Sequence, residues 1–503
     1  MSGAAGKIEV PAGARVFVHQ AFTCCPYAAM ITAKIHDYFE QNGCTISDHP
    51  EEAAISVINT CGFNASRSEQ ALRSIRAIRK RAPTSPLVIA GCLTRIERGR
   101  VQEALEGVPA WVMIGPGEHG TFDDLLASAV LQFDEVQSNL YKDRYSSGDP
   151  RLGLYQVLVS TGCLNTCSYC VIRQAKGTVS SKPIEQVVAE VERGLELGHR
   201  DVFLVGDDIS SYGGDLGVDV VQLLDRLTRG GGEGRFSAEA FEPSRFIAHL
   251  DGLLPVFERD RFSWIVLPAQ SGSDRVLEAM NRSYTVADVR DAVARLKQAA
   301  PGMIVSTDFI FGFAGETAEE FEASIDLASV FDYANFNDYE PRPGTPDIEI
   351  AAEEMERRKA VVNALLRKQG GQVQVLTRNR SVVCDWWKDG DSPMVGRRAP
   401  TRWAVESARR LETMVEAGGA ALASGWSVTR LKADLDRVML LATHEDRDDV
   451  MEFMVVRRDE KAPCMAFSDD YNLTLVSDEA VDRPDEERMA ALDALVDLLG
   501  MRC

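Results

Sequence analysis

The first 130 residues alternate between short apolar runs and longer segments whose apolar residues recur every three or four positions. The short runs are typical of strands, and the longer segments are typical of helices with one buried face. The expected strands are residues 14–20, 53–60 and 86–91, and the expected helices are residues 28–42 and 66–82. Strands that alternate with helices indicate a parallel sheet. We therefore expect an N-terminal α/β domain over residues 1–130.

A polar stretch that ends in turn-forming residues, 131–150, is expected to be a linker. The alternation of strands and helices then resumes over residues 151–347. The expected strands are residues 155–160, 201–206, 262–268 and 303–313, and the expected helices are residues 183–198, 273–282, 286–300 and 317–331. Repeated strand–helix units of this size predict a full or partial parallel barrel.

The pattern changes after residue 347. A strong helix is expected first, followed by short strands and a final acidic helix: residues 353–369, then 381–387, 436–443, 452–459 and 472–477, then 485–500. Residues 348–503 are therefore expected to form a separate α+β domain. Trp386 and Trp387 within it could be a buried core pair or a surface on which a base stacks.

Composition places the chain among soluble globular proteins. Its 503 residues are 45% apolar and 26% charged, and the length suits two or three domains. No uninterrupted apolar stretch of about 20 residues occurs, so we expect no membrane span. The N-terminus lacks the basic and apolar regions of a secretory signal, which favours a cytoplasmic location.

The net charge of −21 bears on the substrate. A protein that grips a phosphate backbone usually has a basic surface, so the charge favours a protein, a peptide or a small molecule over tRNA. The charge could also serve only to keep the protein soluble. A local basic patch, such as Arg397, Arg398 and Arg402, would restore the tRNA interpretation.

The strongest chemical signal is a group of three cysteines, Cys163, Cys167 and Cys170, which we call the central triad. Three thiolates on a [4Fe–4S] cluster leave one iron without a protein ligand, and S-adenosylmethionine (SAM) can chelate that iron. Electron transfer to SAM would then give a 5′-deoxyadenosyl radical. Zinc usually needs a fourth ligand, and no partner pair lies nearby. A redox pair formed by Cys167 and Cys170 is the other alternative.

A second set of cysteines, Cys25, Cys61 and Cys92, follows the expected N-terminal strands, and we call it the N-terminal triad. The carboxyl ends of parallel strands meet at one edge of a sheet, where open α/β sheets place their ligands. These three thiols are therefore expected to meet there.

Several runs in order resemble the radical SAM methylthiotransferase family. They are TCCPY, VINTCGF, AGCLTR, STGCLNTCSYC, VFLVGDDISSYGGD, LPAQSGSDRVLEAMNRSYT, TDFIFGFAGET and DYEPRPGTPD. The resemblance covers residues 14–347. It implies an enzyme that converts an unactivated C–H bond into C–S by adding a methylthio group, and that depends on two [4Fe–4S] clusters, SAM and a reductant such as flavodoxin or ferredoxin.

The resemblance also implies roles for residues. The central triad would hold the cluster that binds SAM, and the N-terminal triad would hold an auxiliary cluster that carries the inserted sulfur. The main chain around Tyr169 would touch adenine. Other candidates for SAM binding lie at strand ends that face the same mouth of the barrel, although they could equally be ordinary polar loop residues: Gly206, Asp207, Asp208, Gln270, Ser271, Ser306, Thr307 and Asp308.

The sequence departs from the family pattern near both triads. Cys24 precedes Cys25 where glycine is usual, so Cys24 could be an alternative ligand, a spare thiol or a packed residue, although the Cys-Pro pair favours Cys25. Ala28 replaces an asparagine, and Arg173 and Lys176 stand where proline and arginine are usual. The small basic C-terminal barrel of the family is not recognisable. Three alternatives therefore stay open: a tRNA methylthiotransferase, a radical SAM enzyme without methyl transfer, and a non-catalytic iron–sulfur or zinc interaction module.

Overall fold

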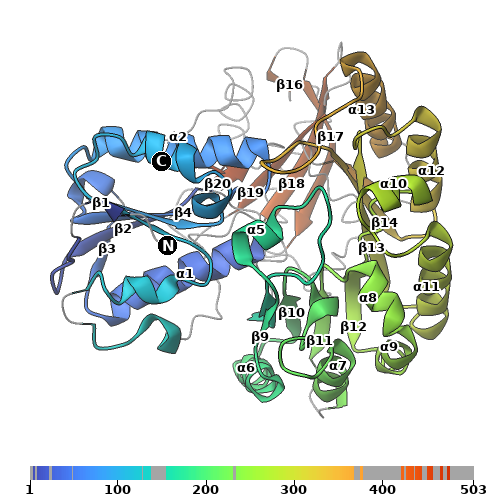
Figure 1. Ribbon diagram of the computed structural model, residues 1–503, viewed down its shortest axis with the longest axis horizontal. Helices are drawn as coiled ribbons and strands as arrows, with labels where there is room; N and C mark the ends of the chain where they lie inside the picture. Colours follow the sequence, from blue (N-terminus) through green and yellow to red (C-terminus); the bar gives the residue numbers. More distant parts are fainter. Residues whose placement is uncertain are drawn as a thin grey trace.

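The computed structural model describes most of the first 367 residues. The ranges are 8–21, 25–47, 49–126, 129–136, 155–229 and 234–367, together with β1 and the strands β15 to β21, whose bounds are given below. Figure 1 shows an N-terminal domain at the left and a curved sheet covered by helices at the right.

The N-terminal domain is built on a six-stranded sheet in the order β1-β6-β5-β4-β2-β3. Its strands are β1 (Ala4–Ala5), β2 (Arg15–Gln20), β3 (Thr45–Ser47), β4 (Ile55–Thr60), β5 (Leu87–Gly91) and β6 (Trp111–Ile114). All neighbours pair in parallel except β1 with β6. The expected parallel α/β arrangement is therefore confirmed, with β1, β3 and β6 as strands that the apolar pattern did not predict.

Helices cover both faces of this sheet, α1 on one side and α2 on the other (Figure 1). The helices are α1 (Pro26–Gln41), α2 (Ala65–Arg81), α3 (Leu93–Ile96) and α4 (Arg98–Ala104), with short 3-10 turns η1 (Pro50–Glu52), η2 (His119–Phe122) and η3 (Phe133–Glu135). Burial on both faces explains why every residue of β4 is buried and why its sequence does not alternate.

The N-terminal domain extends beyond the expected boundary at residue 130. Phe133 and Val136 are buried in the core on the α1 side, and the Phe133 ring stacks on Phe122 at 5.1 Å between centroids. Residues 131–136 thus belong to this domain rather than to a linker. The rest of the expected linker, 137–150, lies outside the described residues.

The second sheet has seven parallel strands in the order β15-β14-β13-β12-β11-β10-β7. Its strands are β7 (Tyr155–Leu158), β10 (Asp201–Val205), β11 (Arg235–Ala238), β12 (Phe262–Val266), β13 (Ile304–Phe311), β14 (Tyr333–Asp338) and β15 (Gln374–Thr377). This is the expected partial barrel. The sequence pattern missed β11, which is only four residues long, and β14, which carries three polar residues among six.

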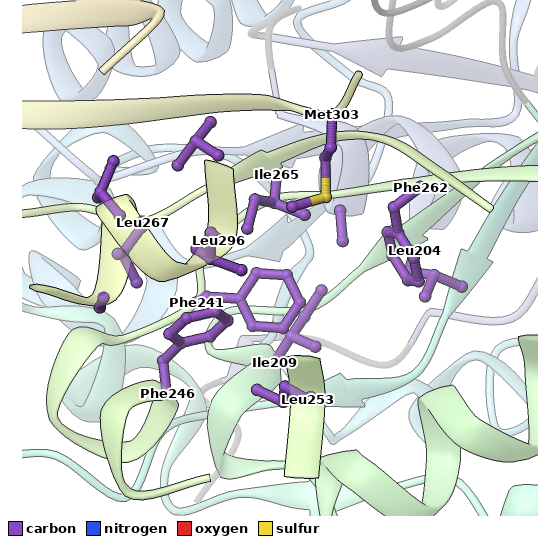
Figure 2. Close-up of a cluster of buried hydrophobic side chains, with 14 of the residues drawn as sticks. Leu204, Ile209, Phe241, Phe246, Leu253, Phe262, Ile265, Leu267, Leu296 and Met303 are labelled. Carbon is purple, nitrogen blue, oxygen red and sulfur yellow. The ribbon is translucent and has the colours of Figure 1, made fainter. Parts of the chain in front are cut away.

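Helices follow the barrel strands and cover their outer face. They are α6 (Ile184–Glu196), α7 (Val220–Arg229), α8 (Pro243–Ala248), α9 (Leu250–Phe257), α10 (Asp274–Ala279), α11 (Val286–Ala299) and α12 (Ala318–Ala328). Shorter pieces near the first strand are β8 (Ser160–Thr161), β9 (Ser180–Ser181), α5 (Ile172–Lys176) and η6 (Ile209–Ser211). Figure 2 shows the apolar layer between sheet and helices, where Phe241 and Phe246 pack edge to face at 5.4 Å.

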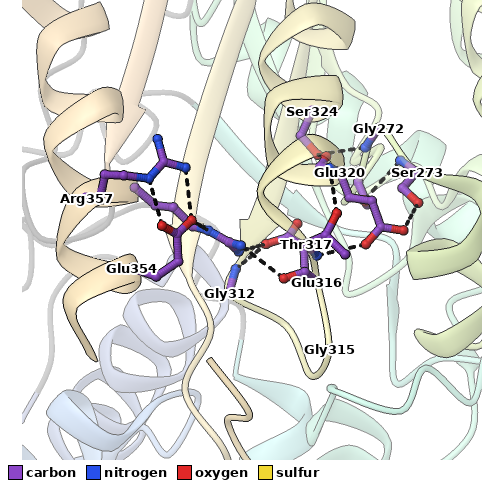
Figure 3. A network of polar contacts seen from close by, with 12 residues as sticks. Gly272, Ser273, Gly312, Gly315, Glu316, Thr317, Glu320, Ser324, Glu354 and Arg357 are labelled. Carbon is purple, nitrogen blue, oxygen red and sulfur yellow. Dashed lines mark hydrogen bonds and ion pairs between the residues drawn. The ribbon is translucent and has the colours of Figure 1, made fainter. Parts of the chain in front are cut away.

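Helix α13 (Ala352–Arg367) belongs to the barrel as well. Met355 and Val362 join the barrel core, and the Arg358 guanidinium, only 1% exposed, lies 2.5 Å from Glu316 (Figure 3). Strand β15 then extends the sheet beyond β14. The expected boundary at residue 348 therefore comes one helix and one strand too early.

The described strands of the C-terminal region form an antiparallel sheet in chain order. They are β16 (Ala421–Ala423), β17 (Trp426–Asp434), β18 (Arg437–His444), β19 (Val450–Val456), β20 (Met465–Phe467) and β21 (Leu473–Leu475). The expected strand 381–387 and final helix 485–500 lie outside the described residues, as do Trp386, Trp387 and Arg397 to Arg402. None of the described helices is both long and apolar enough to cross a bilayer.

Candidate active site

The central triad lies on the loop between β8 and α5. Gly162 begins the loop with a φ of +75°, and a Cβ there would lie 2.2 Å from the Thr178 carbonyl oxygen, so only glycine fits. The Cys163 sulfur accepts hydrogen bonds from the backbone and side-chain amides of Asn165, at 3.3 and 3.4 Å. The Cys170 sulfur accepts from the Ile172 backbone at 3.5 Å. Hydrogen bonds of this kind to sulfur stabilise thiolate ligands and tune iron–sulfur clusters.

All three central cysteines line a cavity of about 400 Å³ at the carboxyl ends of the barrel strands. That volume is in the range of small-molecule and cofactor sites, and the place is where barrel enzymes bind their ligands. The cavity also reaches Phe63, Asn64 and Arg67 of the N-terminal domain. Residues from both domains therefore surround one space.

Of the expected SAM-binding residues, the structure places five around this cavity: Tyr169, Asp207, Asp208, Gln270 and Asp308. Gln270 has the clearest sign of a missing partner. Its backbone has a φ of +66°, which is strained for a residue with a side chain, and its Oε1 is buried without a hydrogen bond. A bound molecule with a donor group would satisfy that oxygen, so the cavity fits SAM on both volume and chemistry.

Asp208 connects the end of β10 to the central triad. Its carboxylate accepts hydrogen bonds from Ser211 and, at 3.1 Å, from Asn165, and it lies 3.7 Å from the Cys163 sulfur. Burial raises the pKa of the Cys163 thiol to about 12, and the nearby carboxylate of Asp208 adds to this effect. Because a metal binds the thiolate, binding of cluster iron at Cys163 would release this proton.

The other four expected residues are not among those that line this cavity. The Ser306 hydroxyl accepts from Trp264 Nε1 at 2.6 Å, and the Thr307 hydroxyl accepts from the Ala269 backbone at 2.9 Å. Ser271 is fully buried and accepts from the Ser273 backbone at 3.2 Å. A Cβ on Gly206 would lie 3.1 Å from Ile209. The structure thus gives these four residues packing and hydrogen-bonding contacts within the fold.

The N-terminal triad lies at the carboxyl edge of the other sheet. Cys25 is the N-cap of α1, Cys61 directly follows β4, and Cys92 is the N-cap of α3 after β5. Gly91 allows the turn into Cys92, because a Cβ there would lie 2.2 Å from the Thr60 carbonyl oxygen. Burial raises the pKa of Cys25 and of Cys92, and the nearby thiol of Cys61 adds to the rise in both. Cys24 lies outside the described residues, whereas Cys44 is buried in the domain core.

The donor set of each triad fits an iron–sulfur cluster. Among the described residues, neither triad brings its three sulfur atoms all within 4.8 Å of one another, whereas thiolates on one zinc ion at about 2.3 Å would lie roughly 4 Å apart. Three thiolates on a cubane cluster leave one iron open.

Two buried ion pairs near the cavity were not predicted from the sequence. Arg282 lies 3.0 Å from Glu242, and its guanidinium faces the Tyr169 ring at 5.6 Å. Arg342 forms an ion pair with Glu97 and donates to the Gly62 carbonyl at 2.9 Å and the Ser68 hydroxyl at 2.7 Å. The second pair ties the barrel to the N-terminal domain. Within the barrel domain, the Lys176 ammonium nitrogen lies 2.7 Å from the Asp207 carboxylate.

Comparison with known proteins gives matches over both domains. Residues 18–113 match the family described as "Uncharacterized protein family UPF0004", and residues 157–328 match the "Radical SAM superfamily". A tRNA-2-methylthio-N(6)-dimethylallyladenosine synthase of Anaplasma marginale is 31% identical over 358 residues, which cover 65% of this chain and 74% of that protein.

Two further relatives have similar names. A probable threonylcarbamoyladenosine tRNA methylthiotransferase of Pyrococcus horikoshii is 29% identical over 60% of this chain and 72% of its own length. A tRNA-2-methylthio-N(6)-dimethylallyladenosine synthase of Stutzerimonas stutzeri is 28% identical over 72% of this chain and 86% of its own length.

Proposed function

Because the chain belongs to the radical SAM methylthiotransferase family, we propose that it attaches a methylthio group to an N6-substituted adenosine of tRNA. The family membership makes the protein a radical SAM methylthiotransferase that uses two [4Fe–4S] clusters and SAM. The proposal adds the substrate. It rests on the names of the relatives, each of which refers to tRNA.

The net charge of −21 favoured a protein, peptide or small-molecule substrate, but charge is unevenly distributed along the chain. Helix α2 carries six cations and one carboxylate: Arg67, Arg73, Arg76, Arg79, Lys80 and Arg81, with Glu69. A concentrated positive helix can attract a phosphate backbone although the whole protein is acidic. This helix begins at the cavity, because its N-cap Asn64 is one of the lining residues.

An exposed aromatic ring lies at the same place. Phe63 is 53% exposed and lines the cavity, and the Arg67 guanidinium lies 5.8 Å from the centroid of its ring. An aromatic ring beside an arginine is a surface on which a nucleobase stacks. Phe63 follows Cys61 by two residues, so a base stacked there would lie next to the N-terminal triad.

In the proposed enzyme the two triads divide the work. The central triad holds the cluster that binds SAM, with Tyr169, Asp208, Gln270 and Asp308 around the SAM molecule, and the N-terminal triad holds the auxiliary cluster. When bound, these groups supply the radical and sulfur chemistry of the reaction. The chain's own residues hold the reactants in one cavity and restrict the access of water to it.

The test uses the protein reconstituted anaerobically with iron, sulfide, SAM and a reductant. We expect total tRNA from cells that lack this protein to gain a methylthio-modified adenosine, measured by mass spectrometry of digested nucleosides. The variant in which Cys163, Cys167 and Cys170 are alanine should give none. If wild-type protein cleaves SAM but leaves this tRNA unmodified, the tRNA proposal is wrong, and the acidic charge would then direct the search to peptides and metabolites.

A further inference from the structure

We propose that Lys176 is a positioning residue that carries a fixed positive charge from the barrel domain to the auxiliary cluster of Cys25, Cys61 and Cys92. The inference rests on the family membership and on the fit of the N-terminal triad to a cluster. It does not depend on the tRNA substrate.

Lys176 reaches the other domain because of where α5 lies. This helix leaves the loop of the central triad and packs against α3, which begins at Cys92. Val171 and Ala175 form a small apolar cluster with Ile96 and Cys92. The last residue of α5 is therefore a barrel residue whose side chain lies beside the N-terminal triad.

The ammonium group is held from two sides. Its nitrogen lies 2.7 Å from the carboxylate of Asp207 and 3.5 Å from the centroid of the Tyr27 ring, and its side chain is only 5% exposed. Tyr27 is two residues from Cys25. A charge that is buried, ion-paired and packed on an aromatic face has little freedom to move and is weakly screened by solvent.

The buried ion pair keeps Lys176 charged. An ammonium group that lies 2.7 Å from a carboxylate is stabilised in its cationic form, which offsets the effect of burial. The group that the barrel places beside the N-terminal triad is therefore a cation.

Asp207 completes the link to the central triad. One of its oxygens binds Lys176, and the other accepts the Gly162 backbone N–H at 2.8 Å, directly before Cys163. Both oxygens thus have partners within the protein. The Asp207 carboxylate therefore fixes Lys176 relative to the loop of the central triad. The charge of Lys176 is positioned by the central site and acts on the auxiliary cluster.

The electrostatic consequence has a definite sign. A cluster held by three thiolates gains negative charge when it is reduced, and a nearby fixed cation stabilises the reduced form. Lys176 should therefore raise the reduction potential of the auxiliary cluster. Loss of its charge should lower that potential.

The experiment isolates the auxiliary cluster in the full-length chain with Cys163, Cys167 and Cys170 changed to alanine. The reduction midpoint is measured by paramagnetic resonance during a redox titration, without SAM or tRNA. In this background we expect Lys176→Met to lower the equilibrium constant for reduction about tenfold, which is about 59 mV for one electron. Lys176→Arg, which keeps the charge, should stay close to the background value.

Lys182→Met is the matched control. Lys182 is also a partly buried lysine in an ion pair, with its nitrogen 2.6 Å from Glu190 of α6, but it lies outside α5, the helix that packs against α3. An unchanged midpoint in Lys176→Met with the cluster intact, or an equal shift in Lys182→Met, would overturn the proposal. If Lys176→Met loses the cluster while Lys176→Arg keeps it, the charge requirement is supported. Loss in both variants would indicate a packing role and refute the proposal.

Discussion

At the scale of single residues, the position of Cys25 suits its proposed role as a ligand of the auxiliary cluster. It is the N-cap residue of α1, but its side chain makes no capping hydrogen bond. Its backbone carbonyl accepts from Ala29 at 2.9 Å, which fixes the first turn of the helix. Pro26 follows and stabilises the helix start without needing a hydrogen-bond acceptor.

Changing Cys25 to alanine should therefore remove one ligand of the auxiliary cluster. Of about eight irons expected per chain, about four should be lost, and no methylthio product should form. Formation of 5′-deoxyadenosine should continue, because the central triad is intact. Iron analysis and chromatography of the products check this. Cys24→Ala is the control and should behave as wild type; the reverse pattern would mean that Cys24 is the ligand.

Single residues also show which parts of the candidate site can be predicted from the sequence. The central triad could be proposed from the spacing of its cysteines, and the N-terminal triad because its cysteines follow expected strands. Ser306 and Thr307 are also expected at a strand end, but they lie within β13, where their hydroxyls accept hydrogen bonds from Trp264 and the Ala269 backbone. Partners this distant along the chain are known only once the strands are paired. The Arg282–Glu242 ion pair, 40 residues apart, was missed for the same reason.

At the scale of elements, α13 shows how a helix can be predicted correctly and assigned to the wrong domain. The sequence shows the length of the helix and the periodic spacing of its apolar residues, but it does not show which residues the helix contacts. An arginine in the middle of a helix is ordinarily expected to face solvent. In the structure, the Arg358 guanidinium instead donates hydrogen bonds to both the carboxylate and the backbone carbonyl of Glu316. Figure 3 shows this contact continuing through Glu316 to the Gly312 backbone.

Arg358→Met should leave the Glu316 carboxylate buried without its cation. Breaking one side of a buried pair costs about 3–5 kcal/mol, so the free energy of unfolding should fall by that order. The urea midpoint, measured by circular dichroism, checks this. Arg357→Met is the control, because the neighbouring Arg357 also pairs with Glu354 at 2.7 Å but is 45% exposed. It should change the midpoint little, and equal effects of the two changes would contradict this account of α13.

At the scale of the whole molecule, two parallel sheets present their carboxyl edges to a common region. Each sheet carries one triad at the position that its topology favours for ligands. The contacts between the domains include Arg342 with Glu97 and the hydrogen bond from the Ala65 backbone to Glu340, at 2.8 Å. These two polar contacts act together with apolar contacts, such as those of Cys92 and Ile96 with Val171 and Ala175, to hold the two proposed cluster sites in place relative to each other.

We therefore expect Arg342→Met to weaken the cooperation of the two cluster sites without preventing either cluster from assembling. Both clusters should still assemble, because their ligands lie within their own domains, and SAM should still be cleaved. The methylthio product formed per 5′-deoxyadenosine should fall, because small misplacement of reacting groups costs about tenfold to a hundredfold in rate. Iron analysis and the ratio of the two products measure these quantities.

Arg275→Met is the control, since Arg275 pairs with Glu320 at 2.5 Å within the barrel alone. An unchanged product ratio in Arg342→Met would show that the domains keep their alignment without this pair, and a matching fall in Arg275→Met would point to general loosening of the barrel.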